Sequence, residues 1–238
     1  MTLESPSRFT LNIEDVDWAR VVERLCFLFP PVIGVGFVGV LQDADPNVPG
    51  VRWGLVLFGA FGYTFLTVGL MVALFLDARR IRARSGAAGN WRPNPWLTVV
   101  FALLWAPAAG VVYLYRRHRR FGTPAGWPKW WLVIALSLVS TIVGLTTAVI
   151  AYVLAMPSLL ATGIGFAGAV AFGLFPIAIH QDAAYLSTRR VPWNPNPGAY
   201  LGLAFLSLFV PVIQPVLATY YLLRRRRVMR RSVSAARS

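Results

Sequence analysis

The side chains of this sequence that could carry out chemistry are few and widely spaced. The chain has two histidines, His118 and His180, and a single cysteine, Cys26. A zinc site needs three or four converging ligands, and these residues together with scattered carboxylates do not supply them. The sequence also lacks a nucleophile elbow, a phosphate-binding loop and a His-Glu-x-x-His helix. We therefore expect no enzyme activity, no metal site and no cofactor.

One glycine pattern imitates a cofactor motif. Gly34, Gly36 and Gly39 match the G-x-G-x-x-G fingerprint, but they lie inside an apolar stretch without a preceding strand. We interpret them as positions where helices approach closely. A second set of small residues repeats every four positions, at Ala161, Gly165, Ala169 and Gly173. This repeat predicts a tightly packed central helix.

The most informative polar residues belong to a pattern that occurs twice. The element Trp-x-Pro-Asn-Pro begins at Trp91 and again, 102 residues later, at Trp193. An aspartate and a pair of arginines precede each copy, and an apolar stretch ending in Tyr and Arg follows each copy. The candidate structural or solute-contact residues are Asp77, Trp91, Asn94, Asp182, Trp193, Asn196 and Gln214. The matching order predicts an internal duplication.

Each copy of the element predicts a helix that begins at the membrane surface. Proline suits the first turn of a helix, while Trp and Tyr prefer the level of the lipid headgroups. Asp77 and Asp182 fall where the preceding helix leaves the hydrocarbon. Two interpretations stay open for them: a polar functional site at the membrane surface, or a structural clasp that fixes the loop. Gln214, between Pro211 and Pro215, is the strongly polar residue that we expect deepest in the membrane.

The composition of the chain suits lipid rather than water. Of the 238 residues, 57% are hydrophobic and 13% are charged, where soluble domains carry about 25% charged residues. Six stretches without Asp, Glu, Lys or Arg are long enough, or nearly so, to cross a hydrocarbon core of about 30 Å. They are residues 25–41, 54–76, 96–115, 130–154, 159–179 and 198–223. The predicted fold class is an all-α membrane protein with six apolar helical segments in two tandem three-segment repeats.

The same patterns divide the chain into three parts. The first is an N-terminal interfacial segment in which Asn12 caps a short helix. The second is a single membrane domain made of the two repeats, and the third is a basic C-terminal tail. Their bounds are 1–24, 25–223 (repeat 1 25–120, repeat 2 130–227) and 224–238.

Two topologies are open for the third segment of each repeat. If all six segments span, 15 basic residues lie on the side of the termini and 8 lie on the other side. If residues 96–115 and 198–223 instead re-enter as hairpins, 22 basic residues share one side and 1 lies opposite. Basic residues favour the cytoplasm, so both termini are predicted to be cytoplasmic. The first topology makes the repeats inverted and the second makes them parallel.

The net charge of +14 is concentrated beside the membrane segments. The residues expected to hold lipid headgroups are Arg116, Arg117, Arg224, Arg225, Arg226 and Arg227. Each basic residue near an anionic surface adds about 1 kcal/mol of attraction, so anionic membrane lipids are the expected partners. A protein partner or a homo-oligomer remains open. No nucleic acid is expected, because the basic tail has no aromatic residue for base stacking.

One repeat ends in a run that resembles a known family. Tyr113, Leu114, Tyr115, Arg116, Arg117 and His118 form this run. With the acidic residue and the Trp-Pro motif, it resembles uncharacterised haloarchaeal multi-spanning membrane proteins, over about half of the chain. The second copy departs from the run, with Leu223 and Arg226 where Tyr and His would stand. The resemblance implies an archaeal membrane protein, and the family brings no known activity.

These observations predict an integral protein of the cell membrane rather than an enzyme. The leading hypothesis is a scaffold or accessory subunit that contacts lipids or partner proteins. The alternative is a transporter or channel for a neutral or weakly polar solute, because duplication and proline-interrupted segments are typical of midplane binding sites. An ion-coupled carrier is disfavoured, since no ionisable side chain is predicted at membrane depth.

Overall fold

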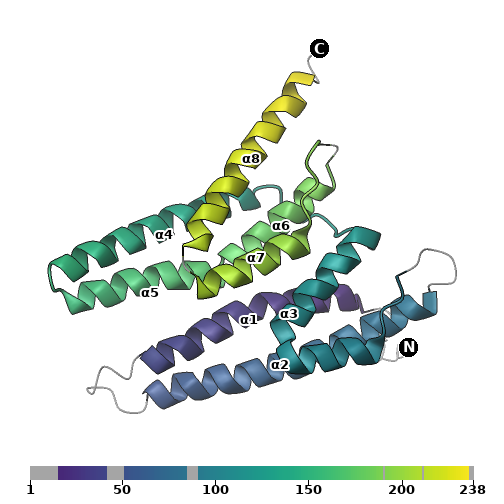
Figure 1. Cartoon of the computed structure of the whole chain (residues 1–238), viewed down its shortest axis with the longest axis horizontal. Coiled ribbons are helices and arrows are strands. Elements are labelled where there is room, and N and C mark those ends of the chain that lie inside the picture. The colour runs from purple at the N-terminus through teal and green to yellow at the C-terminus, as the bar shows by residue number, and fades with distance from the viewer. Residues whose placement is uncertain (1–15, 42–50, 85–90, 190, 211, 236–238) are drawn as a thin grey trace, which may run out of the picture.

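The computed structural model describes residues 16–41, 51–84, 91–189, 191–210 and 212–235. Within them the chain is helical and contains no strand. The eight helices are α1 (Trp18–Leu41), α2 (Val51–Arg84), α3 (Pro95–Phe121), α4 (Trp130–Val153), α5 (Pro157–Gly173), α6 (Phe175–Ser187), α7 (Pro197–Phe209) and α8 (Ile213–Ala235). Figure 1 shows α1, α2, α4 and α5 lying along the long axis of the molecule.

The first helix begins earlier than the apolar stretch that predicts it. α1 begins at Trp18 and continues without interruption to Leu41. The residues from Trp18 to Arg24 therefore belong to the long helix, not to a separate interfacial one. Asn12, the predicted cap, lies outside the described residues. The fifth apolar stretch is divided between α5 and α6, with Pro176 in the first turn of α6.

Two helix pairs approach each other closely at glycines. Where α1 crosses α2, a Cβ atom on Gly59 would lie 2.7 Å from the Cα of Gly36. Where α4 crosses α5, a Cβ atom on Gly144 would lie 2.8 Å from the carbonyl oxygen of Gly163. Such contacts require residues without side chains. The interpretation of the first glycine cluster as a close helix approach is confirmed at Gly36, and at Gly39, which packs on Leu55 and Val56.

The prediction for the small-residue repeat of the fifth segment is wrong. Ala161, Gly165 and Ala169 are exposed, and a side chain on Gly165 or Gly173 would meet open space. The buried face of α5 instead holds Gly163 and Ala167. These residues are offset by two positions, or about 200° around a helix, from the predicted set. α5 is therefore a peripheral helix whose opposite face packs against α4.

α3 bends sharply near its middle and turns back. Trp105 leaves the helical conformation, with φ −157° and ψ 85°, two residues before Pro107. Proline lacks the backbone N–H group and clashes with the preceding turn, which breaks the helix there. Trp91, just before α3, contacts Phe121 at its last residue, with ring centroids 6.3 Å apart. A straight helix of 27 residues would separate its ends by about 40 Å, so α3 folds back on itself (Figure 1).

α7 and α8 form a second folded-back segment. Val210, the residue after α7, leaves the helical conformation, with φ −128° and ψ 89°; the α conformation is disfavoured for a residue that precedes a proline. Tyr200 in the first turns of α7 contacts Tyr221 of α8, with ring centroids 5.0 Å apart. Because 21 residues of straight helix would span about 31 Å, the chain reverses between them.

The core consists of two apolar clusters joined through α7. One cluster is formed mainly by α1, α2 and α3, and the other by α4, α6, α7 and α8. Leu201 and Phe205 of α7 lie in the first cluster, whereas Ala204 of α7 lies in the second. Gly198 packs directly on the backbone of Tyr115 in α3, which brings the two folded-back segments together.

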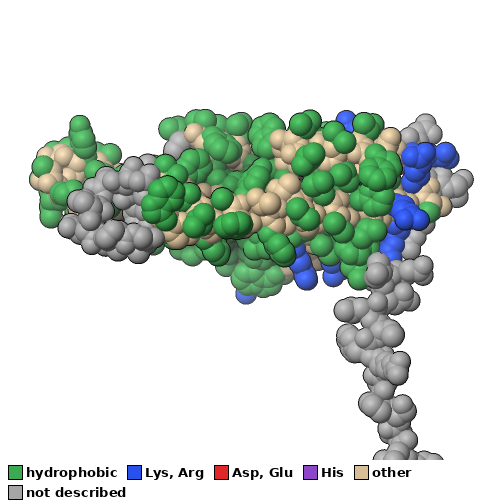
Figure 2. Space-filling model, turned by 90° about the horizontal axis from the view of Figure 1, so that it is seen from below, with side chains coloured by type: hydrophobic (Ala, Val, Ile, Leu, Met, Phe, Trp, Pro, Cys, Tyr) green, Lys and Arg blue, Asp and Glu red, His purple; other side chains and the backbone are tan. Residues whose placement is uncertain are grey.

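The surface of the molecule is that of a protein in lipid. Within the described residues, five helical segments are long and apolar enough to cross a membrane, with α5 and α6 taken together as one segment: Trp18–Val40, Trp53–Ala83, Pro95–Phe121, Trp130–Val153 and Pro157–Ser187. Pro197–Phe209 is a shorter apolar helix. Figure 2 shows hydrophobic side chains over most of the visible face, with Lys and Arg gathered mainly toward one end. Large apolar side chains such as Phe65 and Leu104 are 79% exposed, which water would not favour.

Candidate functional site

The first of the predicted aspartates is buried in a hydrogen-bonded group that we call the first cluster: Asp77, Tyr113 and Arg117. Asp77, near the end of α2, is 3% exposed. Its Oδ2 accepts from the Tyr113 hydroxyl at 2.7 Å and from Arg117 Nε at 3.1 Å. Tyr113 and Arg117 are four residues apart and therefore share one face of the returning arm of α3. The first cluster ties that arm to α2.

The second aspartate has the same partners in the second cluster: Asp182, Tyr221 and Arg225. Asp182 of α6 is fully buried, and its Oδ2 accepts from the Tyr221 hydroxyl and from Arg225 Nε, each at 2.9 Å. Tyr221 and Arg225 are again four residues apart, on α8. The guanidinium group of Arg225 also lies 5.3 Å from the ring centroid of Trp131 in α4. The second cluster joins α6 to α8.

The predicted Trp and Asn residues lie next to these clusters. Trp91 packs against Tyr113 at 5.6 Å between ring centroids, and Trp193 packs against Tyr221 at 5.2 Å.

Asn94 and Asn196, both candidate structural or solute-contact residues, cap the N-termini of α3 and α7. Asn94 Oδ1 accepts from the backbone N–H of Trp96 at 3.1 Å, and Asn196 Oδ1 accepts from that of Ala199 at 3.2 Å. Asn196 Nδ2 also donates to the Tyr115 carbonyl at 3.1 Å, across the contact between the two folded-back segments.

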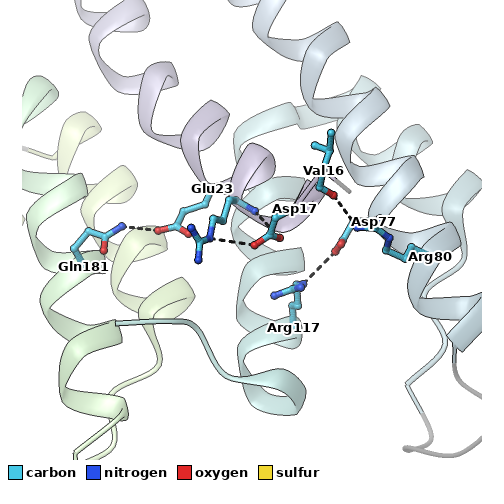
Figure 3. Close-up of polar contacts among 8 residues, drawn as sticks. Val16, Asp17, Glu23, Asp77, Arg80, Arg117 and Gln181 are labelled. Carbon is cyan, nitrogen blue, oxygen red and sulfur yellow. Dashed lines mark hydrogen bonds and ion pairs between the residues drawn. The ribbon is translucent and has the colours of Figure 1, made fainter. Parts of the chain in front are cut away.

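A third polar group connects α1 to α6. Gln181 Nε2 donates to Glu23 Oε1 at 2.6 Å, and Nδ1 of the buried His180 lies 3.4 Å from the same oxygen. Figure 3 shows Glu23 and Gln181 pointing toward each other, with Arg117 pointing toward Asp77 on the other side of α1. Nearby, Arg20 pairs with Asp17, and Arg80 donates to the carbonyl of Val16 at 2.7 Å. His180 thus faces Glu23.

The arginines predicted to hold lipid headgroups divide into two kinds. Arg117 and Arg225 face inward onto the aspartates. Arg224 lies over the ring of Trp193, at 4.9 Å from its centroid. The exposed members are Arg116, Arg224, Arg226 and Arg227, and none of them has an ion pair within the described part of the chain.

Gln214 lies apart from both clusters, at the start of α8. It is 1% exposed, and neither atom of its amide has a hydrogen-bond partner among the described residues. The hydroxyl of Thr141 in α4 is also buried without a partner there. In the described ranges, no group of three His, Cys, Asp or Glu side chains could hold a metal ion.

Sequence reasoning singled out the two aspartates but not the tyrosines that bind them, and it assigned the paired Arg117 and Arg225 to lipid headgroups instead. Tyr113 and Tyr221 belong to the repeated pattern only as the tyrosines that end apolar stretches, and Glu23 is not among the predicted site residues. The available signal was the Tyr-x-x-x-Arg spacing, which occurs in both copies and places both side chains on one helical face.

The fold and these contacts are those of a helical protein with several helices suited to crossing a membrane. Comparison with protein-family models, with curated proteins and with solved structures gave no match.

Proposed function

We propose that the chain is a non-enzymatic integral membrane protein, a scaffold or accessory subunit that contacts lipids or partner proteins at its basic end. The observation that carries this proposal is the use of its acidic groups. All four carboxylates in the described residues are engaged within the chain: Asp17, Glu23, Asp77 and Asp182. General acid–base catalysis or ion coupling would need an ionisable group facing a substrate. Among the described residues, exposed basic side chains such as Arg116, Arg226 and Arg227 instead have no ion pair.

We propose further that the chain consists of two like halves, each with two spans and one re-entrant hairpin. Three correspondences support this proposal. In both clusters the aspartate accepts from a Tyr hydroxyl and an Arg Nε, and in both halves the Trp ring packs on the Tyr of its own cluster. The third segment of each half, α3 or α7–α8, also folds back near a proline. Re-entrant backbone must be covered by protein. The arm of α3 after the bend meets this requirement, because Ala106, Pro107 and Gly110 are buried and Gly110 packs against Cys26 of α1. Leu104 and Trp105, at the bend itself, are exposed on the surface of the protein.

This arrangement places nearly all basic residues on one side of the membrane. With α1, α2, α4 and the α5–α6 segment as the four spans, both termini and the ends of both hairpins share that side. Of the 23 basic residues, 22 then lie there, in agreement with the positive-inside tendency. The proposed side is the cytoplasm, whose anionic leaflet attracts such residues.

Cysteine labelling tests the architecture. In a Cys26→Ala background, single cysteines replace three exposed residues: Ala83 in the last turn of α2, Ala125 after α3 and Met156 between α4 and α5. An impermeant reagent is expected to label positions 83 and 125 from the cytoplasmic side and position 156 from the opposite side. Labelling of positions 83 and 125 from opposite sides would mean that α3 spans the membrane, and would overturn the hairpin architecture.

A transporter or channel for a neutral solute is the second candidate, favoured by the unpartnered amide of Gln214 at the break between α7 and α8. Flux assays in proteoliposomes separate the two functions. A scaffold is expected to leave water, glycerol and urea permeation at the level of protein-free vesicles. Accelerated flux that is lost in Gln214→Leu would replace the scaffold proposal with the transporter.

A further inference from the structure

An open cleft of about 650 Å³ lies between α4 and α8 at the basic end of the molecule. This volume is in the range of natural small-molecule sites, about 300–1,000 Å³. Its lining is of two kinds: apolar Trp131, Ala135, Leu222 and Met229, and basic Arg225, Arg226 and Arg230. A site lined in this way fits an amphipathic anion better than a wholly polar one.

Helix geometry orders the two kinds of side chain along the cleft. Leu222, Arg226 and Arg230 follow one another at four-residue spacing and so line one face of α8. Trp131 and Ala135, also four residues apart, form the facing wall on α4. Figure 1 shows α8 crossing the first part of α4 and then running on beyond the other helices to the C-terminus. The cleft therefore changes from apolar to basic toward the end of α8.

The charges of the cleft are partly compensated. Asp182 holds Arg225 through Nε and fixes its guanidinium group over Trp131, which leaves its other N–H groups unused by that bond. Arg226 and Arg230 have no ion pair in the part of the chain that the structure describes. The N-terminus of α4, which begins at Trp130, adds a partial positive charge at the same place. The cleft thus has about two positive charges, those of Arg226 and Arg230, that no acidic side chain of the described residues compensates.

We infer that this cleft binds the head of one anionic phospholipid, whose phosphate oxygens accept hydrogen bonds from Arg226 and Arg230. Arginine matches phosphate geometry through paired N–H donors. The first part of an acyl chain lies along Trp131, Ala135 and Leu222, which a soluble phosphate would leave in water. The inference rests on the proposed function, because it needs the basic end of the molecule to lie at the membrane surface.

Lipid retention measured by native mass spectrometry tests the site. The full chain is stripped of lipid in detergent and titrated with phosphatidic acid or with phosphatidylcholine. We expect one phosphatidic acid per chain to be retained, with at least tenfold preference over phosphatidylcholine. Arg226→Gln combined with Arg230→Gln is expected to weaken retention at least tenfold, since both charge-assisted hydrogen bonds to the phosphate are lost. Both residues are exposed, so folding is expected to persist.

The matched control removes the same charge elsewhere on the basic end. Arg116→Gln with Arg120→Gln alters two exposed arginines of α3 that line no part of the cleft. This variant is expected to retain the lipid as the unaltered chain does. Equal loss in both double variants would overturn the specific site and leave only general attraction to an anionic surface, with the proposed function intact.

A change of shape without a change of charge provides a second test. Ala135→Phe fills the apolar wall of the cleft and is expected to reduce lipid retention, whereas Leu136→Phe on the exposed side of α4 is expected to have no effect.

Competition with glycerol phosphate distinguishes a lipid phosphate from a soluble phosphate as the ligand. If glycerol phosphate displaces the lipid at a concentration equal to that of the lipid, the site binds soluble phosphate and the lipid assignment is refuted.

Discussion

Because Arg225 compensates the buried carboxylate of Asp182, we expect its substitution to lower the free energy of unfolding strongly. Asp182 is fully buried, and the side chain of Arg225 is 12% exposed at 2.9 Å from it. Arg225→Gln removes the compensating charge with a shorter side chain. The second cluster then keeps only the hydrogen bond from Tyr221 on that oxygen.

The size of the effect follows from this burial. Breaking one side of a buried ion pair costs about 3–5 kcal/mol, because an uncompensated charge remains in a medium of low polarity. Arg117→Gln in the first cluster is expected to cost less, about 1–3 kcal/mol, since the Arg117 side chain is 23% exposed and the pair is partly solvated. Asp182→Asn combined with Arg225→Gln removes both charges and is expected to recover part of the loss.

The free energy of unfolding is measured in mixed micelles, by tryptophan fluorescence during denaturant titration. Lipid-stripped protein is used, so that loss of a bound ligand does not count as loss of stability. Arg227→Gln, an exposed change in the same basic run, is the control and is expected to stay within about 0.5 kcal/mol of the unaltered chain. A cost for Arg225→Gln no larger than this control, or a double variant as unstable as Arg225→Gln alone, would refute the reasoning.

Three further changes are checked by the same unfolding measurement. Gly144→Leu is expected to destabilise by at least about 1–3 kcal/mol, because it forces α4 away from α5, whereas Gly165→Leu, in open space, should be neutral. Asn196→Ala removes a helix cap and a contact between the folded-back segments, at a cost of about 1–2 kcal/mol. Gln214→Leu removes an unpartnered buried amide and is expected to stabilise by about 1–3 kcal/mol; a loss of stability would reveal a bound solute or water.

The helical elements could be predicted from the sequence because hydrocarbon excludes charge. Every apolar stretch without a charged residue corresponds to helix, and the prolines at 107 and 211 mark both places where the third segments bend. The direction after each bend could not be predicted, because a proline in a membrane helix is compatible with a mild kink as well as a reversal. Contacts far apart in the sequence, such as Trp91 with Phe121, decide it.

The packed face of α5 shows a different limit of sequence reasoning. Small residues occupy both the Ala161-Gly165-Ala169 face and the Gly163-Ala167 face, so spacing alone does not distinguish them. The neighbouring helix α4 determines which face of α5 is packed, because its Gly144 lies against Gly163 and Ala167. A pattern of small residues predicts that a close contact is allowed, and not which face makes it.

The positions of the two clusters explain how the arginines are divided between the interior and the surface. In each basic run, the residue four positions after the buried tyrosine shares its helical face and must turn inward, while Arg116, Arg226 and their neighbours point elsewhere. An inward arginine needs a buried acid, which Asp77 and Asp182 provide. One arginine per arm thus fixes the returning helix to the protein, and the exposed arginines remain available to the membrane surface. The tyrosine position therefore indicates which arginine of each basic run turns inward, namely Arg117 and Arg225.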